Sequence, residues 1–294
     1  MKSSIILISN PVAKKTSERR IEEASHFLRS KGYGVKIVST KHKGDAENLA
    51  REAIKDLPSL IIAAGGDGTF NEVINGIAGS KIPMAILPSG TTNVLAKELG
   101  IPENVKSALE IAVGRTPKTI SLGKITITHH SSLVTRYFIL MAGVGFDGEA
   151  VFGINETIKK ISGKGAYIYS GIKTLFRFNP DELILNIDGK TFSGYSVIIG
   201  NASKYGGHFK VAPDARLTDP VLYTCLFKRK NPLNIVRYVF GVLTGSHLRF
   251  KDVECLKAKS IEITGNAHIQ IDGDYFGMTP ATVEIIPDMA RLVY

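Results

Sequence analysis

The chain of 294 residues is poor in the features that mark secreted, membrane-spanning or disordered proteins. It has two isolated cysteines, Cys225 and Cys255, and no C-x-x-C pair, so the cysteines say nothing about a metal site. The lack of a disulfide framework suits a reducing cytosol. No stretch reaches the roughly 18 to 20 apolar residues of a membrane span. The apolar run near the start, residues 5–8, is too short for a signal peptide. We therefore predict a cytoplasmic globular protein.

Several signatures of chemistry are also missing. None of the seven histidines falls in an H-E-x-x-H motif, and no Ser-His-Asp or Cys-His arrangement stands out. The net charge of +10 implies an anionic partner, such as a phosphorylated small molecule or an acidic membrane. Because no recognition motif or aromatic stacking pattern accompanies this charge, we expect no nucleic-acid partner.

The first third of the chain alternates between two kinds of pattern. Apolar runs predict strands at 4–9, 35–40, 59–64 and 82–87, and helical patterns follow them near 17–31, 45–55, 69–78 and 93–99. Such alternation is typical of an α/β domain with a mainly parallel sheet, which we place at residues 1–118. Ligands of these sheets bind beyond the carboxyl ends of the strands, and all four of these ends are polar or contain glycine.

The remaining residues, 119–294, predict a β-rich second domain. Short β-type runs occur at 119–128, 136–142, 182–188, 195–200, 221–227, 253–264, 268–272 and 281–286. Turn signals between them favour an antiparallel sandwich, interrupted by helices near 163–177 and 232–244. We expect two domains with a cleft between them, and the final residues can return to the first domain.

The stretch from Gly65 to Glu72 is the most informative part of the sequence. It joins a buried strand to a helix through three glycines, which permit sharp turns and close approach to a ligand. Thr69 and Glu72 have the spacing of a capping box, which predicts that the helix begins at Thr69. Unpaired amides at a helix start bind phosphate, but Asp67 would repel it without a metal ion or a proton. The loop therefore predicts a nucleotide site.

A second loop of this design, Pro88 to Asn93, follows the next strand. Two such loops on neighbouring strands can hold a triphosphate and its metal ion. Spacing alone also allows the first loop to be a tight turn with no ligand. Similarly, the Asp272-Gly273-Asp274 stretch reads as a hairpin turn or as an acidic turn that offers a general base.

Together these motifs resemble the diacylglycerol kinase catalytic-domain family, and most closely its bacterial soluble lipid kinases, which are related to diacylglycerol and sphingosine kinases. The resemblance covers nearly the whole chain. It rests on Gly65-Gly66-Asp67-Gly68-Thr69, Asn71-Glu72-Val73, Gly90-Thr91-x-Asn93, Gly143-x-Gly145-Phe146-Asp147, Asn201-Ala202, Pro213-Asp214-Ala215 and Ile271-Asp272-Gly273-Asp274. The Gly-Gly-Asp-Gly loop alone is not specific, because NAD kinases and phosphofructokinases share it.

The resemblance implies an NAD kinase- or phosphofructokinase-like ATP-binding domain and a β-rich domain that takes the lipid. ATP contacts are expected from Asn10, Thr40, Gly66, Asp67, Gly68, Thr69, Thr91 and Asn93. Asp274 stands at the place of the family's proton acceptor, with Asp272 and Asp67 organising Mg²⁺ and phosphates. A structural Mg²⁺ would be held by Asp219 and the main-chain oxygens of Arg216 and Val221.

Three positions depart from the family pattern. Asp274 is one methylene shorter than the usual Glu, which changes its reach to the substrate hydroxyl. Asp219 is followed by Pro220 rather than the usual Gly, which changes the backbone at the structural Mg²⁺ site. Val94 stands where many relatives have Asp, which points to a difference of subfamily or substrate.

Two further patterns have more than one interpretation. Residues 143–148 spell G-x-G-x-x-G but lack a βαβ context, so we do not expect a dinucleotide site there, and Asp147 is instead a candidate to line the acceptor cleft. Residues 163–177 and 228–251 mix basic and apolar side chains. They either cover a sheet with solvated charges or dock on an anionic bilayer.

The sequence thus predicts an ATP- and Mg²⁺-dependent lipid kinase, cytoplasmic and peripherally associated with the membrane, with Asp274 as base. An NAD kinase-like soluble kinase and a catalytically inactive nucleotide- or lipid-binding protein are the alternatives. The lipid alcohol stays open between diacylglycerol, a sphingoid base and other lipids. The oligomeric state stays open too, with a homodimer as one option.

Overall fold

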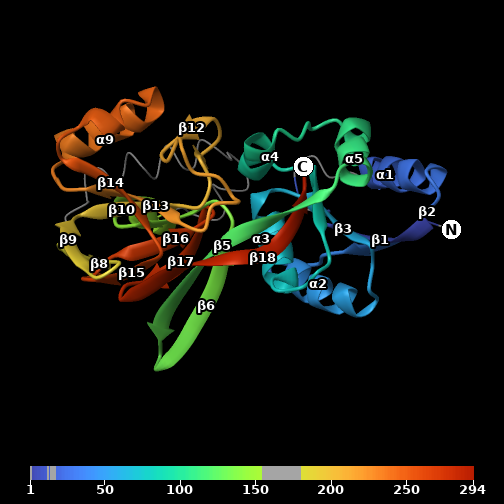
Figure 1. Ribbon diagram of the computed structural model, residues 1–294, viewed down its shortest axis with the longest axis horizontal. Coiled ribbons are helices and arrows are strands. Elements are labelled where there is room, and N and C mark those ends of the chain that lie inside the picture. Colours follow the sequence, from blue (N-terminus) through green and yellow to red (C-terminus); the bar gives the residue numbers. More distant parts are fainter. Residues whose placement is uncertain (1, 12, 14–17, 154–179) are drawn as a thin grey trace. The chain divides into compact units, whose positions relative to one another are not determined.

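The chain forms two compact units in a computed structural model that describes residues 2–11, 13, 18–153 and 180–294 (Figure 1). Unit 1 comprises Met1–Ser121 and Pro287–Tyr294, and unit 2 comprises Leu122–Ile286. Two strands, β5 (Pro117–His129) and β18 (Ala281–Val293), each contribute to both units. The helix predicted at 163–177 lies outside the described residues.

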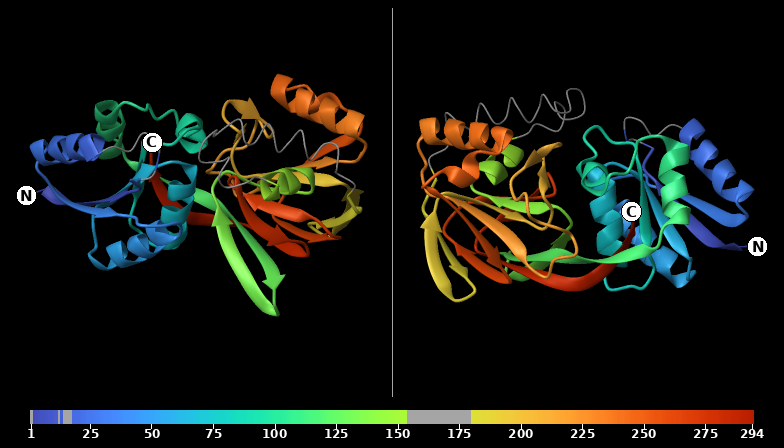
Figure 2. Two further views of the ribbon diagram at one scale, coloured as in Figure 1. Left: turned by 180° about the vertical axis from the view of Figure 1, so that it is seen from behind. Right: turned by 45° about the horizontal axis from the view of Figure 1, so that its top comes forward.

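Unit 1 is built on parallel strands in the order β2-β1-β3-β4, with the last part of β18 beside β4. Its elements are β1 (Lys2–Ser9), α1 (Glu18–Ser30), β2 (Tyr33–Ser39), α2 (Asp45–Lys55), β3 (Leu60–Gly65), α3 (Asp67–Ile77), β4 (Met84–Pro88), α4 (Val94–Leu99) and α5 (Val105–Gly114). Every residue of β3 and β4 is buried, because helices cover both faces of the sheet. Helices α1 and α5 lie on one face, and α2 and α3 lie on the other (Figures 1 and 2).

Two details of unit 1 differ from the sequence prediction. Helix α5 was not predicted, although Asn104 caps it by accepting a hydrogen bond from the Ser107 amide at 3.0 Å. The capping box at Thr69 is wrong, because α3 already begins at Asp67 and has no side-chain cap. Glu72 instead accepts hydrogen bonds from the amides of Gly44 and Ala46, at 2.9 and 3.2 Å. Glu72 therefore caps the neighbouring helix α2 rather than its own.

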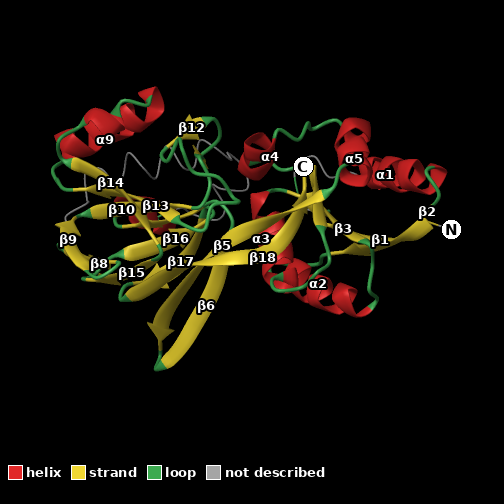
Figure 3. Cartoon of the chain, viewed as in Figure 1, coloured by secondary structure: helices red, strands yellow, loops and turns green. Residues whose placement is uncertain are grey.

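Unit 2 is an antiparallel β sandwich (Figure 3). Its elements after β5 are β6 (Ser132–Phe138), β7 (Met141–Val144), α6 (Phe146–Phe152), β8 (Leu183–Ile187), β9 (Lys190–Gly194), β10 (Ser196–Gly200), β11 (Lys204–Tyr205), β12 (Phe209–Lys210), β13 (Leu222–Phe227), α9 (Pro232–Thr244), η1 (His247–Arg249), β14 (Val253–Ala258), β15 (Ser260–Thr264), β16 (His268–Ile271) and β17 (Asp274–Met278). One sheet has the order β14-β13-β10-β7-β16-β17, and the strands β18-β15-β8-β9 lie in the other.

The core of unit 2 fills the space between these two sheets. Val144, Val197 and Ile269 come from the first sheet, and Leu185, Ile261 and Val283 come from the second, and all six are at most 1% exposed. Strands β8 and β15 alternate between buried and exposed residues, as expected for a sheet with one face in the core. The hairpin strands β9 and β17 were not predicted, although both follow an Asp-Gly turn that was.

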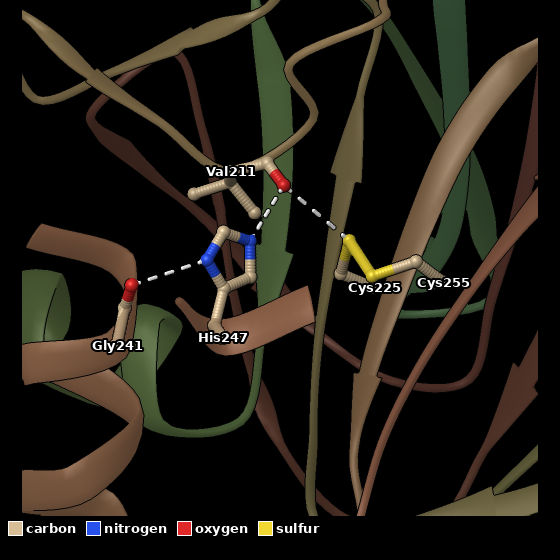
Figure 4. Close-up of a disulfide and its surroundings, with 5 residues drawn as sticks. All are labelled: Val211, Cys225, Gly241, His247 and Cys255. Atoms are coloured by element: carbon tan, nitrogen blue, oxygen red, sulfur yellow. Dashed lines mark hydrogen bonds between the residues drawn. A yellow bond between two sulfur atoms is a disulfide. The ribbon is translucent and has the colours of Figure 1, made fainter. Parts of the chain in front are cut away.

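The prediction that the two cysteines form no disulfide is wrong. Cys225 on β13 lies opposite Cys255 on β14, and the two form a disulfide (Figure 4). The spacing of 30 residues could not reveal this pair, because α9 and η1 separate the two strands along the chain. The disulfide removes cysteine usage as an argument for a reducing compartment.

The predicted fold class is confirmed: an α/β unit with a mainly parallel sheet is followed by an antiparallel sandwich. The G-x-G-x-x-G stretch joins β7 to the short helix α6, but both neighbours of β7 are antiparallel to it. It is therefore no βαβ dinucleotide site. Within the described ranges, no helix is long and apolar enough to cross a membrane.

Candidate functional site

The carboxyl ends of the four parallel strands of unit 1 meet in one cluster of polar groups. The Ser9 and Ser39 hydroxyls are 2.8 Å apart, and the Thr40 amide donates to the Ser9 carbonyl at 2.9 Å. The Asn10 side-chain amide donates to the Thr69 hydroxyl at 3.1 Å. Three of the predicted ATP-binding residues, Asn10, Thr40 and Thr69, are thus brought to this one edge of the sheet.

The two glycine-containing loops of this cluster touch backbone to backbone. The amides of Ser89 and Gly90 donate to the Gly65 carbonyl at 2.7 and 3.1 Å. A Cβ on Gly90 would come within 2.6 Å of the Gly66 Cα, and one on Gly65 within 2.5 Å of the Thr69 hydroxyl oxygen. These glycines are therefore required by close packing of the loops, independently of any ligand.

Asp67 fastens the first loop to the second. Its two carboxylate oxygens accept hydrogen bonds from the amides of Val94 and Leu95, each at 2.9 Å, at the start of α4. Burial raises the pKa of the Asp67 carboxyl above its usual range, and the two amides together with Lys97 only partly offset this effect. Asp67 therefore acts as the acidic cap of α4.

Asn93 closes the second loop on itself. It has a left-handed backbone with a φ of 50°, and its side-chain oxygen accepts from the Gly90 amide at 2.9 Å. Its side-chain amide donates to the Gly90 carbonyl and to the Glu103 carboxylate, both at 3.0 Å. The side chain is buried, so its contacts are with the protein itself.

The exposed positions of this cluster are Gly68 and Thr91. Gly68 lies in the first turn of α3, where backbone N–H groups have no acceptor within the helix. Such a turn attracts anions, and exposed glycine lets a phosphate come close to the backbone. We call these two closely packed loops the cradle; its exposed positions offer the backbone at a helix start and a threonine hydroxyl.

Unit 2 contains the acidic turn at residues 272–274. Asp272 and Gly273 have positive φ angles of 47° and 87°, as a two-residue hairpin turn between β16 and β17 requires. The Asp272 carboxylate accepts hydrogen bonds from three successive amides, those of residues 139, 140 and 141, at 2.8 to 3.0 Å. Asp274 is the half-buried first residue of β17.

A buried carboxylate, that of Asp147, is linked to this turn by hydrogen bonds. Asp147 on α6 accepts hydrogen bonds from the Tyr205 hydroxyl at 2.5 Å and the Gln270 side-chain amide at 2.6 Å. The Gln270 side-chain oxygen accepts from the Gly273 amide at 2.8 Å. Burial raises the pKa of the Asp147 carboxyl, against the effect of its two donors. A chain of hydrogen bonds therefore links Tyr205, Asp147 and Gln270 to the turn.

Asp219, predicted to bind structural Mg²⁺, lies in the turn before β13. Its carboxylate accepts from the Tyr223 hydroxyl at 2.9 Å, and its amide donates to the Arg216 carbonyl at 2.9 Å. Burial, followed by the bond to Asp219, raises the pKa of Tyr223 to about 12. Pro220 is compatible with this turn, because the strand begins only at Leu222.

The described residues include no group of three or more His, Cys, Asp or Glu side chains that could hold a metal ion. Every carboxylate oxygen of Asp67 and Asp272 already accepts a backbone N–H. Both carboxylates therefore hold the backbone of their loops through hydrogen bonds. The set of Asp219 with the Arg216 and Val221 carbonyls fits Mg²⁺ in chemical type, since all its donors are oxygens.

Sequence reasoning missed three residues that organise these sites: Glu103, Tyr205 and Gln270. Glu103 contacts Asn93 across 10 residues of the chain, Tyr205 contacts Asp147 across 58, and Gln270 contacts Asp147 across 123. Isolated Glu, Tyr and Gln residues carry no spacing signal, so only the tertiary structure reveals them.

Comparison with known proteins agrees with this organisation. The family model described as diacylglycerol kinase catalytic domain matches residues 4–125. The model described as YegS C-terminal NAD kinase beta sandwich-like domain matches residues 141–294.

Individual relatives match over almost the full length. A diacylglycerol kinase of Bacillus subtilis (strain 168) is 30% identical over 287 residues, which cover 95% of this chain and 92% of that protein. A diacylglycerol kinase of Staphylococcus aureus (strain JH9) is 29% identical over 96% of this chain and 89% of its own length. The crystal structure of a diacylglycerol kinase from Bacillus anthracis str. Sterne has the same fold, with a TM-score of 0.76 and 24% identity over all of this chain and 98% of that one. The chain therefore belongs to the diacylglycerol kinase catalytic-domain family.

Proposed function

We propose that this protein is an ATP-dependent lipid kinase that transfers the γ-phosphoryl group to a lipid hydroxyl. The observation that carries this proposal is the paired-loop cradle of unit 1, in a chain whose relatives bear the name diacylglycerol kinase. Phosphoryl transfer depends on positioning and charge neutralisation more than on covalent chemistry. A preformed cradle of backbone amides is suited to that task.

In this proposal the first turn of α3 binds the phosphates of ATP. Gly66 and Gly68 bring the backbone close to the phosphate oxygens, and Thr91 contributes a hydroxyl from the open side of the cradle. Asn10 and Thr40 line the same edge of the sheet. Asp67 and Asn93 hold the loops in this arrangement by their bonds to backbone amides, so we assign them positioning roles.

Asp274 is the general base of the proposal. A carboxylate needs only hydrogen-bond reach of the acceptor hydroxyl to take its proton as the new phosphate ester bond forms. The hydrogen bonds from Asp147 through Gln270 fix the turn that contains Asp274. Asp272 binds the same turn to the backbone of residues 139–141. We propose that Asp147, Gln270 and Asp272 hold Asp274 in position for the acceptor hydroxyl.

Magnesium enters the proposal in two places. Bound with ATP, Mg²⁺ would neutralise charge on the phosphates. A structural ion would be held by Asp219 and the Arg216 and Val221 carbonyls, as the family resemblance implies, and would stabilise the turn before β13.

The lipid acceptor implies that the enzyme works at a membrane surface from the cytoplasm. Diacylglycerol is the first acceptor to test, because the relatives carry its name. A sphingoid base offers the same chemistry, a hydroxyl on an apolar body.

The test is incubation with γ-labelled ATP, Mg²⁺ and vesicles that contain diacylglycerol, a sphingoid base or neither, with NAD in a parallel reaction. We expect label in a lipid. Label in NAD instead would establish the soluble-kinase alternative. ATP binding without any labelled product would establish a catalytically inactive binding protein.

Asp274→Ala should lower the rate of transfer by about 100-fold or more, since general bases contribute roughly that much. The affinity for ATP, measured by titration calorimetry, should stay nearly unchanged. The matched control is Asp274→Glu, which restores the family's usual side chain and should keep substantial activity. Full turnover by Asp274→Ala would remove Asp274 from the role of base.

A further inference from the structure

Helix α9 is apolar on two opposite faces. Its inner face packs against unit 2 through buried Ile235, Tyr238, Gly241 and Val242. Its outer face carries five exposed apolar side chains: Leu233 (83% exposed), Val236 (50%), Val239 (45%), Phe240 (64%) and Leu243 (48%). A surface helix of a globular protein normally presents polar residues outward, and an exposed apolar stripe marks an interaction site.

Hydrogen bonds at both ends and on the inner side of α9 fix the position of the helix. Asn231 caps the helix by accepting from the Asn234 amide at 3.0 Å. At the other end, buried His247 lies between the Gly241 and Val211 carbonyls, at 3.3 and 2.9 Å, beside the disulfide (Figure 4). The Tyr238 hydroxyl donates to the Asp252 carboxylate at 2.7 Å. The apolar stripe is therefore a fixed surface and not a frayed end.

Basic residues border this stripe. Residues 228–251 contain six Lys or Arg and no acid. Arg229, Arg249 and Lys251 are exposed and form no ion pair with any residue in the described ranges. Helix α9 also packs against β12, whose Phe209 and Lys210 are exposed and repeat the same pairing of apolar and basic side chains.

We propose that the outer face of α9, with this basic border, docks on an anionic lipid bilayer. Leucine and phenylalanine side chains would enter the boundary between headgroups and acyl chains, as in interfacial helices. The basic border would face lipid phosphates. The proposal deepens the proposed function, because a lipid acceptor has to be reached in its membrane.

Charge decides between a bilayer and a second copy of the chain. A copy related by twofold symmetry would bring the same surface against itself. Residues 228–251 contain no acid, so the two basic borders would repel each other. An anionic bilayer matches both the apolar stripe and the charge around it.

The experiment measures binding of the purified full chain to vesicles, without ATP. Vesicles of phosphatidylglycerol and phosphatidylcholine are compared with vesicles of phosphatidylcholine alone, by co-sedimentation. Leu233→Ser with Phe240→Ser should weaken binding to the anionic vesicles by about tenfold or more. Arg229→Gln, Arg249→Gln and Lys251→Gln should each weaken it about fivefold, the factor that corresponds to about 1 kcal/mol per basic residue near the surface.

The matched control is Leu133→Ser on β6, a leucine that is 76% exposed but lies outside this surface. It should leave vesicle binding unchanged. Equal vesicle binding by the wild type and the α9 variants would overturn the proposal. So would a wild-type dimer that the Leu233 and Phe240 changes convert to a monomer while vesicle binding persists, since the occupant would then be a second copy.

A soluble acceptor separates this proposal from the proposed function. With a short-chain diacylglycerol below its aggregation limit, the α9 variants should phosphorylate lipid at the wild-type rate. If the wild type does not phosphorylate the soluble diacylglycerol, this counts against the lipid-kinase proposal. The vesicle-binding measurement still decides whether α9 docks on anionic bilayers.

Discussion

The two units use a motif aspartate in the same way, as an acceptor for backbone amides. Asp67 in unit 1 gathers two backbone amides at the start of α4, and Asp272 in unit 2 gathers three amides from residues 139–141. Gly68, next to Asp67, is exposed, whereas Asp272 and Asp274 are both half-buried. In both units the conspicuous acid of the motif therefore holds backbone amides, and we propose that a different residue of the same motif contacts the substrates.

The two aspartates differ in their number of amide partners and in their backbone conformation. For Asp67, burial outweighs its donors and raises the pKa of the carboxyl. Asp272 has one more amide partner and sits in a turn with a positive φ, which Asp and Asn adopt more readily than most residues. Three changes test this comparison.

The largest effect on stability is expected at Asp272. Asp272→Asn keeps the turn conformation but places a side-chain amino group against at least one buried backbone amide. Leaving such a donor unsatisfied costs about 2 to 3 kcal/mol. The measurement is the free energy of unfolding of the variant and the wild type from urea titration at pH 7. An unchanged midpoint would show that the three amides are satisfied without this carboxylate.

Gly90→Ala tests whether the stability of unit 1 depends on the contact between its two glycine loops, as the stability of unit 2 is expected to depend on Asp272. The added Cβ would lie 2.6 Å from the Gly66 Cα, so the backbone has to shift, at about 1 to 3 kcal/mol. ATP affinity should fall as well, because the cradle opens. Gly114→Ala is the matched control, since nothing lies within 4 Å of its Cβ position. Equal stability of the two variants would contradict the close packing of the loops.

The smallest effect is expected for Asp67→Asn, about 1 kcal/mol near neutral pH, because losing a buried charge offsets part of the lost hydrogen bonding. The raised pKa fixes the sign of the pH dependence. An acid whose folded pKa lies above its unfolded value of 3.8 contributes stability fully below pH 3.8 and loses it as pH rises through the folded pKa. The stability of the variant relative to the wild type should therefore increase with pH from 3.8 upward in urea titrations. A flat difference would show that the carboxyl is not perturbed.

Local patterns were enough to predict the main elements of unit 1. Buried apolar runs gave β1, β3 and β4, and the glycine loops after β3 and β4 gave the predicted nucleotide edge. The antiparallel sandwich followed from its many short strands and turn signals. The fold class was predictable because each of these signals lies within about ten neighbouring residues.

The roles of individual residues were less predictable, because they depend on contacts between distant segments. Glu72 has the spacing of a cap for its own helix, yet it caps α2, 26 residues earlier. Asp272 reads as a site acid, but its partners lie more than 130 residues away. Such pairings are set by the packing of strands and helices, for which the linear sequence gives no periodic signal.

The path of β18 has a consequence for how the chain can be synthesised. Unit 1 needs residues 287–294 beside β4, with Leu292 opposite Met84. A ribosome delivers these residues only after all of unit 2 has been made. Until then the edge of β4 lacks its neighbour, and an unpaired strand edge is a site for wrong association. Unit 1 therefore cannot be completed before unit 2 has been synthesised, and β18 completes the sheets of both units.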